Sequence, residues 1–266
     1  MGVPVKVALS GSGFRLPAHV GALAALIDHG YDITEIAGTS GGAIVAALFA
    51  SGMHVSEMRH LALTYDWRKV LMFNPVHGVF KGAYCSGNAL MGFLQVQTKG
   101  KRFGDLSIPL KIIASDLRTE SEICFDARRH PMMEIALAAR ASASIPLVYA
   151  PVDYMSFTLV DGGCCNNLPL DHLSPGGLRI GVYLTSANKP SIGSMGIKDV
   201  AERSLDLMLG SNEDTHADLD TLEGGIVVHV PTGYAGSLDR EMATETRLRL
   251  VTEAYQAVTR RVIRRV

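Results

Sequence analysis

The sequence predicts an α/β fold, namely a three-layer α/β/α sandwich with a mostly parallel central sheet. Two segments near the amino terminus each pass from an apolar strand pattern, through a turn that contains glycine, into a helix pattern. Short apolar runs typical of buried strands then recur along the chain. With 266 residues, 47% of them hydrophobic and 19% charged, the chain can bury a large core.

The first strand-to-helix unit begins with an apolar run at 3–9 that ends in a glycine loop. Pro17 suits the first turn of the helix that follows, and His29 before a glycine is typical of a helix end. The second unit places its strand at 34–38 and its helix at 42–51. Two such units in succession favour parallel strands joined by helical crossovers.

Later segments extend the same pattern. We expect strands at 110–117, 122–126, 157–160, 180–184 and 226–230, and helices at 131–140, 198–209 and 240–265. The Gly-, Pro- and Ser-rich segment 186–196 is predicted to be a surface loop, whereas the apolar stretch 71–81 suits either a flap at a lipid interface or a cover over the core or a partner subunit. No repeat or long linker divides the chain, so we interpret residues 1–266 as a single domain.

Charge and cysteine content narrow the cellular setting. The formal net charge of −1 and the isoelectric point near 6.8 give no basic footprint, and no nucleic acid polymer is expected as a partner. The four cysteines lack the spacing of a disulfide framework or a metal site, which favours free thiols in a reducing compartment. No apolar run is long enough for a membrane span. We therefore expect a cytoplasmic protein that contacts membranes only peripherally.

The segment Gly38-Thr39-Ser40-Gly41-Gly42 lies between the second predicted strand and its helix. A serine on such a sharp turn points its hydroxyl outward, and small neighbours let the turn close. This pattern predicts that Ser40 is a nucleophile. An acyl-transfer serine also needs a base for its proton and donors for an oxyanion, so we looked for both.

The loop after the first strand is the candidate for the oxyanion donors. Gly11, Ser12 and Gly13 precede a helix, where backbone N–H groups converge and the helix terminus adds positive potential. The same glycines also resemble the opening of a dinucleotide-binding loop. That pattern requires a third Gly or Ala, and its position is occupied by Leu16.

Asp161 is the candidate base, because it ends the apolar strand 157–160 and is followed by two glycines. Since ligands bind beyond the carboxyl ends of strands in open α/β sheets, Gly11, Ser40 and Asp161 should share one rim. The alternative is that Asp161 merely begins an ordinary Asp-Gly turn.

Four blocks, in order, resemble the patatin-like phospholipases. They are Leu9-Ser10-Gly11-Ser12-Gly13-Phe14-Arg15, Gly38-Thr39-Ser40-Gly41-Gly42, Ala141-Ser142-Ala143-Ser144-Ile145-Pro146 and Asp161-Gly162-Gly163. The resemblance covers about residues 5 to 170, and the ordered set is more specific than any single motif.

The resemblance implies Ser40 as nucleophile, Asp161 as the side-chain base and the N–H groups near Gly11, Ser12 and Gly13 as the oxyanion hole, with no histidine required. It also implies that Arg15 and Gly41 lie on the substrate side, although a structural pairing of Arg15 is an equal alternative. The sequence departs from the family at two places. Ser12 replaces a glycine, and Leu16-Pro17 replaces the usual Gly-Leu.

The resemblance further implies a phospholipase A or lysophospholipase that cleaves acyl esters of membrane glycerophospholipids through an acyl-enzyme. No cofactor is implied. A soluble carboxylesterase or thioesterase with the same residues is one alternative. A second is a membrane-degrading effector gated by a small nucleotide, because short bacterial proteins of this family include cyclic-nucleotide-activated effectors of antiphage defence; a homo-oligomer is compatible with either.

The histidines offer another alternative, a Ser-Asp-His triad completed by His172 or His229. In such hydrolases several strands precede the nucleophile, whereas here Ser40 follows a single strand and helix. No pair of histidines has metal-ligand spacing with a supporting carboxylate, so the sequence predicts no metal site.

Overall fold

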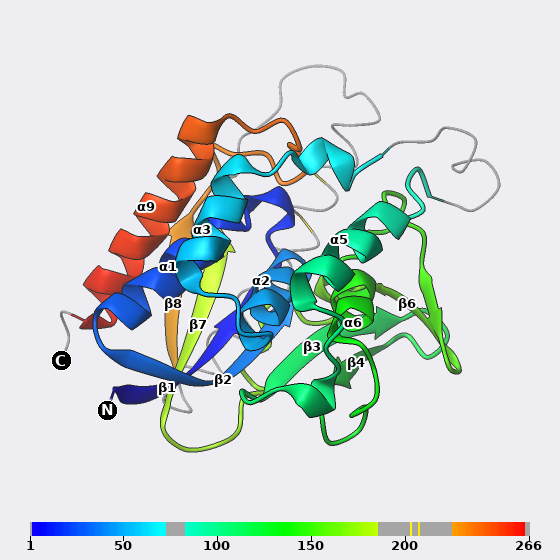
Figure 1. Ribbon diagram of the computed structural model, residues 1–266, viewed down its shortest axis with the longest axis horizontal. Helices are drawn as coiled ribbons and strands as arrows, with labels where there is room; N and C mark the ends of the chain where they lie inside the picture. Colours follow the sequence, from blue (N-terminus) through cyan, green and yellow to red (C-terminus); the bar gives the residue numbers. More distant parts are fainter. Residues whose placement is uncertain (1, 73–82, 186–202, 204–206, 208–224, 264–266) are drawn as a thin grey trace.

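A computed structural model describes residues 2–72, 83–185, 203, 207 and 225–263 (Figure 1). Its centre is one mixed sheet of eight strands, connected in the order β5-β6-β3-β2-β1-β7-β8, with β4 also paired to β3. The strands are β1 Val3–Leu9, β2 Tyr31–Thr39, β3 Leu110–Asp116, β4 Ser121–Phe125, β5 Val152–Tyr154, β6 Phe157–Asp161, β7 Leu178–Thr185 and β8 Ile226–Pro231. In the part of the sheet ordered β3-β2-β1-β7-β8, all neighbouring strands are parallel. Strands β4 and β6 pair antiparallel with β3, and β5 pairs antiparallel with β6.

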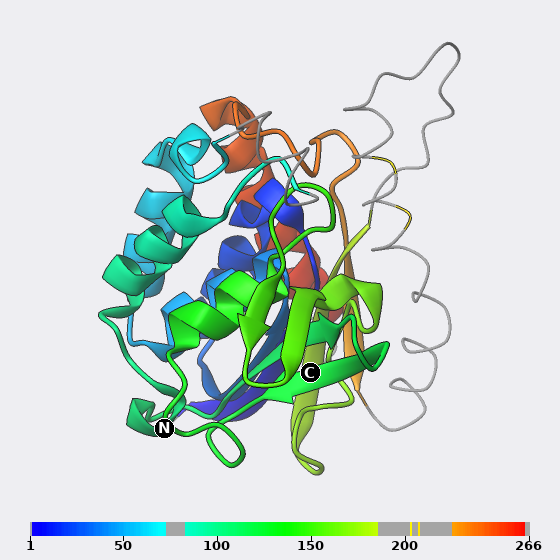
Figure 2. The ribbon, with the colours of Figure 1, turned by 90° about the vertical axis from the view of Figure 1, so that its right-hand side faces the viewer.

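The helices of the described residues gather on one face of this sheet, as Figure 2 shows. They are α1 Pro17–Asp28, α2 Gly41–Ala50, α3 Val55–Thr64, α5 Asn88–Thr98, α6 Ile135–Ser142 and α9 Thr244–Arg261. The shorter 3₁₀ turns include η1 Gly13–Arg15 and η4 Gly162–Cys164. Helix α2 is buried almost all round, because it lies centrally and packs against α1, α3, α5 and α6.

The second face of the sheet has its own apolar cluster. Side chains from four parallel strands, including Ala8 and Tyr183, pack there against Leu168, Leu170 and Leu173. These leucines lie in the segment that follows η4, so the chain covers this face immediately after it leaves the end of β6. The layered α/β architecture with a mostly parallel sheet, predicted from the sequence, is confirmed.

Most predicted strands and the first two helices are found within a few residues of their expected bounds. The helix predicted at 131–140 begins only at Ile135, because Glu134 forms a β-bridge with Arg102 and the Ile135 N–H donates to Lys101 O. The helix predicted at 240–265 is shorter, running from Thr244 to Arg261. Helices α3 and α5 and strand β5 were not predicted.

Three predicted features lie largely or wholly outside the described residues: the loop at 186–196, most of the helix at 198–209 and most of the apolar stretch at 71–81. The assignment of residues 1–266 to a single domain stays a prediction.

The pairing of β3 brings the ends of β2 and β6 together. Residues 114–116 of β3 pair with both β4 and β6, and residues 112–113 pair with both β2 and β4. Since a strand has only two edges, β2 and β6 must share the edge opposite β4. Thr39 pairs with Ile113 and Asp161 pairs with the next residue along β3, so the two strands end face to face.

Close packing of α1 on α9 yields a test of the fold. A Cβ at Gly21 of α1 would collide with the backbone carbonyl of Val251 in α9, whereas a Cβ at Gly92 of α5 would meet nothing within 4 Å. Alanine favours a helix over glycine by about 1 kcal/mol. Gly92→Ala should therefore raise the free energy of unfolding by up to about 1 kcal/mol. Gly21→Ala should lower it by about 1–3 kcal/mol, because the helices must move apart.

Urea denaturation monitored by circular dichroism measures both variants. Equal stabilisation by the two substitutions would contradict the close approach of α1 and α9.

Candidate active site

Ser40 occupies the sharp turn between β2 and α2. Its backbone has φ 53° and ψ −123°, a conformation that L-residues rarely adopt and that costs about 1–3 kcal/mol. The turn closes tightly because Gly42 has no Cβ, and a Cβ there would collide with the carbonyl of Leu9 in β1. The Ser40 N–H donates to Ser142 Oγ at 2.8 Å, which holds the strained residue in place.

The Ser40 hydroxyl donates directly to the Asp161 carboxylate, with 2.6 Å between Oγ and Oδ2. The other carboxylate oxygen, Oδ1, accepts the Gly163 N–H at 2.8 Å. Both Ser40 and Asp161 are almost completely buried. Burial raises the pKa of Asp161 to about 7, although the hydrogen bonds from Ser40 and Gly163 act in the opposite direction.

Two serines of the segment 142–144 position both of these residues. Ser142 accepts the N–H of Ser40 through its side chain, and Ser144 accepts the N–H of Asp161 through its backbone carbonyl at 2.9 Å. The sequence marked this segment only by its resemblance to a family block. Its contacts show that it holds the backbone of both Ser40 and Asp161.

Arg140, which the sequence analysis did not single out, anchors this segment from inside the protein. The side chain is 3% exposed, and its guanidinium donates to Ser144 Oγ and to the backbone carbonyls of Ser86, Gly87 and Ala150. Burial lowers the pKa of Arg140 from its usual value. The available signal in the sequence was an arginine among four alanines at the end of a predicted helix. An arginine in such apolar surroundings is seldom buried unless its charge is paired.

The predicted oxyanion loop lies beside the turn at Ser40. The N–H of Gly11 donates to Asn167, both to its backbone oxygen and to Oδ1, at 3.1 and 3.0 Å. Within the described part of the chain, no acceptor is recorded for the N–H groups of Ser12, Gly13 or Gly41. Gly41 is the first residue of α2, where the helix dipole adds positive potential.

Arg15 points into the protein rather than toward solvent. It is 1% exposed, and its guanidinium donates to the carbonyl of Ser12 and to Thr232 Oγ1. These contacts tie the loop to the segment after β8. They match the structural pairing that the sequence left open for Arg15.

The three histidines considered from the sequence lie elsewhere. His172 Nε2 contacts Glu122 Oε1 at 2.6 Å, and the His229 ring packs against Tyr183. His19 is fully buried and contacts the Ser10 carbonyl through Nε2; burial lowers its pKa to about 4, so it is neutral. Because Ser40 donates straight to Asp161, no imidazole stands between these two side chains.

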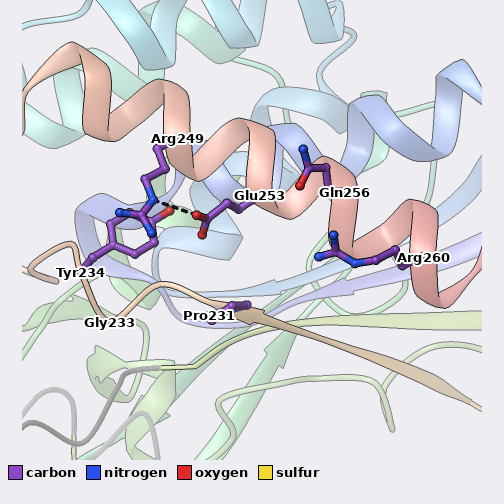
Figure 3. A pocket seen from close by; sticks show the side chains of 7 residues that line it. All are labelled: Pro231, Gly233, Tyr234, Arg249, Glu253, Gln256 and Arg260. Atoms are coloured by element: carbon purple, nitrogen blue, oxygen red, sulfur yellow. Dashed lines mark hydrogen bonds and ion pairs between the residues drawn. The ribbon is translucent and has the colours of Figure 1, made fainter.

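A separate pocket lies between α9 and the end of β8 (Figure 3). It has a volume of about 510 Å³, and none of the predicted site residues lines it. Arg249 covers the ring of Tyr234 and pairs with Glu253 at 2.7 Å, so its charge is already engaged. The pocket is therefore distinct from the pair formed by Ser40 and Asp161.

The sequence profile of the patatin-like phospholipases matches residues 7–174. The chain belongs to this family. It is 32% identical over 167 residues to an NTE family protein of Mycobacterium tuberculosis. The aligned region covers 62% of this chain and 44% of that relative. It is 33% identical over 185 residues to the protein YqhO of Bacillus subtilis, covering 60% of this chain and 64% of the relative.

Solved structures support the same fold. VipD from Legionella pneumophila superposes with a TM-score of 0.61 at 14% identity, covering 97% of this chain and 66% of VipD. The type III effector ExoU superposes with a TM-score of 0.57 at 16% identity, covering 99% of this chain and 53% of ExoU. The chain matches 44% to 64% of the length of the first curated relatives. The helices of the described residues include none with the length and apolar character of a membrane span.

The hydrogen bond between Ser40 and Asp161 predicts the direction of a pKa change. Because this bond stabilises the ionised carboxylate, Ser40→Ala should raise the pKa of Asp161 above its value of about 7. Titration of the ¹³C-labelled aspartate carboxyl by NMR measures the shift. Ser115→Ala is the matched control, because the Ser115 hydroxyl donates to the backbone carbonyl of Asp161 and not to the carboxylate. An unchanged or lower pKa in Ser40→Ala would rule out this role for the bond.

Proposed function

We propose that this chain is a serine lipid acyl hydrolase that uses Ser40 as nucleophile and Asp161 as the only side-chain base. The observation that carries the proposal is the 2.6 Å hydrogen bond from Ser40 Oγ to a buried carboxylate. Membership of the patatin-like phospholipases supports the reaction class, and a serine hydrogen-bonded to a base is an arrangement suited to acyl transfer.

In the acylation step, Asp161 Oδ2 takes the proton of the Ser40 hydroxyl as Oγ attacks the carbonyl carbon of the ester. The tetrahedral oxyanion accepts hydrogen bonds from the N–H groups of Ser12, Gly13 and Gly41, and the amino terminus of α2 adds positive potential. When the intermediate collapses, the ester C–O bond breaks. Asp161 returns the proton to the departing alcohol, and the acyl group stays on Ser40.

Deacylation uses the same groups with water as the nucleophile. Asp161 accepts a proton from water, whose oxygen attacks the acyl carbon. The bond to Ser40 Oγ then breaks, and the serine regains its proton from Asp161. The product is a free fatty acid, and both side chains return to their starting states.

Burial explains how an aspartate can serve as this base. An unperturbed carboxyl near pKa 3.9 holds a proton too weakly to take one from a hydroxyl efficiently. The buried site raises the pKa of Asp161 to about 7, which is close to the value that suits a general base at neutral pH. The Gly163 N–H keeps the carboxylate oriented, so that Oδ2 faces Ser40.

Within the proposed mechanism, Gly11 and Arg15 position the loop instead of touching substrate. The N–H of Gly11 donates to Asn167, and the guanidinium of Arg15 donates to the backbone carbonyl of Ser12. A side chain at position 12 is compatible with the proposal, because the Ser12 hydroxyl turns toward the carbonyl of Gly13 at 3.3 Å and leaves its own N–H without a recorded acceptor in the described residues.

We infer a membrane glycerophospholipid or lysophospholipid as the substrate, on the strength of the family alone. A water-soluble ester is the competing substrate. The cytoplasmic location, peripheral membrane action, small-nucleotide activator and homo-oligomer expected from the sequence stay predictions.

Two substitutions test the proposed pair. Ser40→Ala removes the nucleophile and Asp161→Asn removes the base, so each should lower fatty acid release by at least about 1,000-fold. The assay uses the purified chain with mixed-headgroup phospholipid vesicles, and a soluble p-nitrophenyl ester in parallel. Gly92→Ala is the matched control and should keep wild-type turnover. The substitution lies far from the pair in sequence, and the added Cβ would meet no atom within 4 Å.

Fatty acid release that survives Ser40→Ala would remove Ser40 from its role. Hydrolysis of the soluble ester without hydrolysis of vesicles would assign the same residues to a carboxylesterase.

The raised pKa of Asp161 predicts the pH dependence. Because the base must be ionised, kcat/KM should be constant above about pH 8 and fall roughly tenfold per unit below a pKa of about 7. Initial rates on the soluble ester between pH 5 and 9 measure this profile without interference from vesicle binding. A rate that stays flat down to pH 5 would mean that the base has an ordinary aspartate pKa.

A further inference from the structure

A cluster of metal-binding side chains lies outside the proposed catalytic pair. Glu122 comes from β4, whereas Asp171 and His172 come from the segment after η4, 50 residues later. His172 Nε2 is 2.6 Å from Glu122 Oε1 and 3.9 Å from Asp171 Oδ2. One ligand atom from each of the three residues lies within 4.8 Å of the other two.

A buried amide lies against this cluster. Asn166 is 2% exposed, and its amide lies against Asp171, with 3.1 Å from Nδ2 to Oδ1. The oxygen of the same amide is buried and has no hydrogen-bond partner among the described residues. The donor end of the amide faces Asp171, so Asn166 holds this carboxylate in place through a neutral hydrogen bond.

Neighbouring contacts hold the cluster in place. The Lys111 ammonium donates to the backbone carbonyl of His172 and pairs with Glu35 at 2.8 Å, which fixes the main chain at the histidine. Cys124, two residues beyond Glu122 on the same face of β4, lies within hydrogen-bond reach of the His172 ring. The imidazole is therefore confined between two side chains of one strand.

We propose that Glu122, Asp171 and His172 bind a divalent transition-metal ion of the zinc class. Imidazole nitrogen and carboxylate oxygen are ligands of such ions at about 2.0–2.2 Å, so two ligands of a tetrahedral site lie about 3.4 Å apart. The distances of 2.6 and 3.9 Å from His172 Nε2 bracket that spacing. The ion takes the place of the proton between His172 Nε2 and Glu122 Oε1, which is released to solvent, and small side-chain movements adjust the ligand spacing.

The bound ion fastens the segment after η4 to β4. This segment carries the leucines that cover the second face of the sheet, and it also contacts the proposed active site. The Thr39 hydroxyl donates to the carbonyl of Asn166, and Asn167 accepts the N–H of Gly11. The ion thus acts as a structural brace behind the turn at Ser40, and it is independent of the proposed hydrolysis.

Zinc titration of the metal-free full-length chain tests the site. Isothermal calorimetry and elemental analysis after dialysis should give one Zn²⁺ per chain, and the ion should raise Tm by mass action. His172→Gln and Asp171→Asn should each weaken binding more than about 100-fold, beyond the effect of losing a residue that only supports a ligand. Ser40→Ala should bind Zn²⁺ as the wild type does, which separates this proposal from the proposed function.

His54→Gln is the matched control, because His54 is an exposed histidine at the start of α3 whose ring contacts Ser56, while its backbone N–H, not its ring, donates to the Glu57 carboxylate. It should leave Zn²⁺ affinity unchanged. Circular dichroism checks folding, and if His172→Gln does not fold, the half-exposed Asp171→Asn decides alone. Binding only at millimolar Zn²⁺, binding that His54→Gln abolishes, or binding that Asp171→Asn leaves intact would each overturn the proposal.

Discussion

One edge of β3 carries the ends of two strands that arrive from opposite directions. β2 runs parallel to β3 and stops at Thr39, while β6 runs antiparallel and stops at Asp161, one pairing position further along. The residue after β2 and the last residue of β6 therefore meet, although 121 residues separate them in the chain. Because backbone pairing of the sheet fixes these ends, the two short side chains of Ser40 and Asp161 are held within hydrogen-bond reach of each other.

The fold bears a cost for this arrangement. The positive φ of Ser40 costs about 1–3 kcal/mol. Raising the pKa of Asp161 from 3.8 to about 7 means that ionisation of the buried carboxyl costs about 4 kcal/mol, a cost that appears as pH rises from about 4 to 7. A typical domain has only about 5–15 kcal/mol of stability, so these costs are a large fraction of it. Three hydrogen bonds hold these groups against this cost: the Ser40 N–H donates to Ser142 Oγ, the Asp161 N–H donates to the Ser144 carbonyl, and the Gly163 N–H donates to the Asp161 carboxylate.

Burial takes the place of a histidine at this site. His19, close in sequence to the loop at Gly11–Gly13, is neutral because it is buried, and its Nε2 is engaged by the carbonyl of Ser10. Within the described residues, the hydrogen bonds recorded at the Asp161 carboxylate come only from neutral donors, the Ser40 hydroxyl and the Gly163 N–H. Neutral donors orient the carboxylate without lowering its pKa as far as a cation would, which keeps it basic.

The sequence by itself determined the parallel strand-to-helix units, the turn at Ser40 and the strand that ends at Asp161, because glycine placement and apolar periodicity are local signals. Its family resemblance also drew attention to the segment that contains Ser142 and Ser144. Only the tertiary structure decided that this segment positions Ser40 and Asp161 and that Arg140 anchors it. It alone also decided that Asn167 accepts the N–H of Gly11 and that Glu122 lies beside His172. These features depend on the order and register of strands around β3, and pairings between residues distant in the chain leave no local pattern in the sequence.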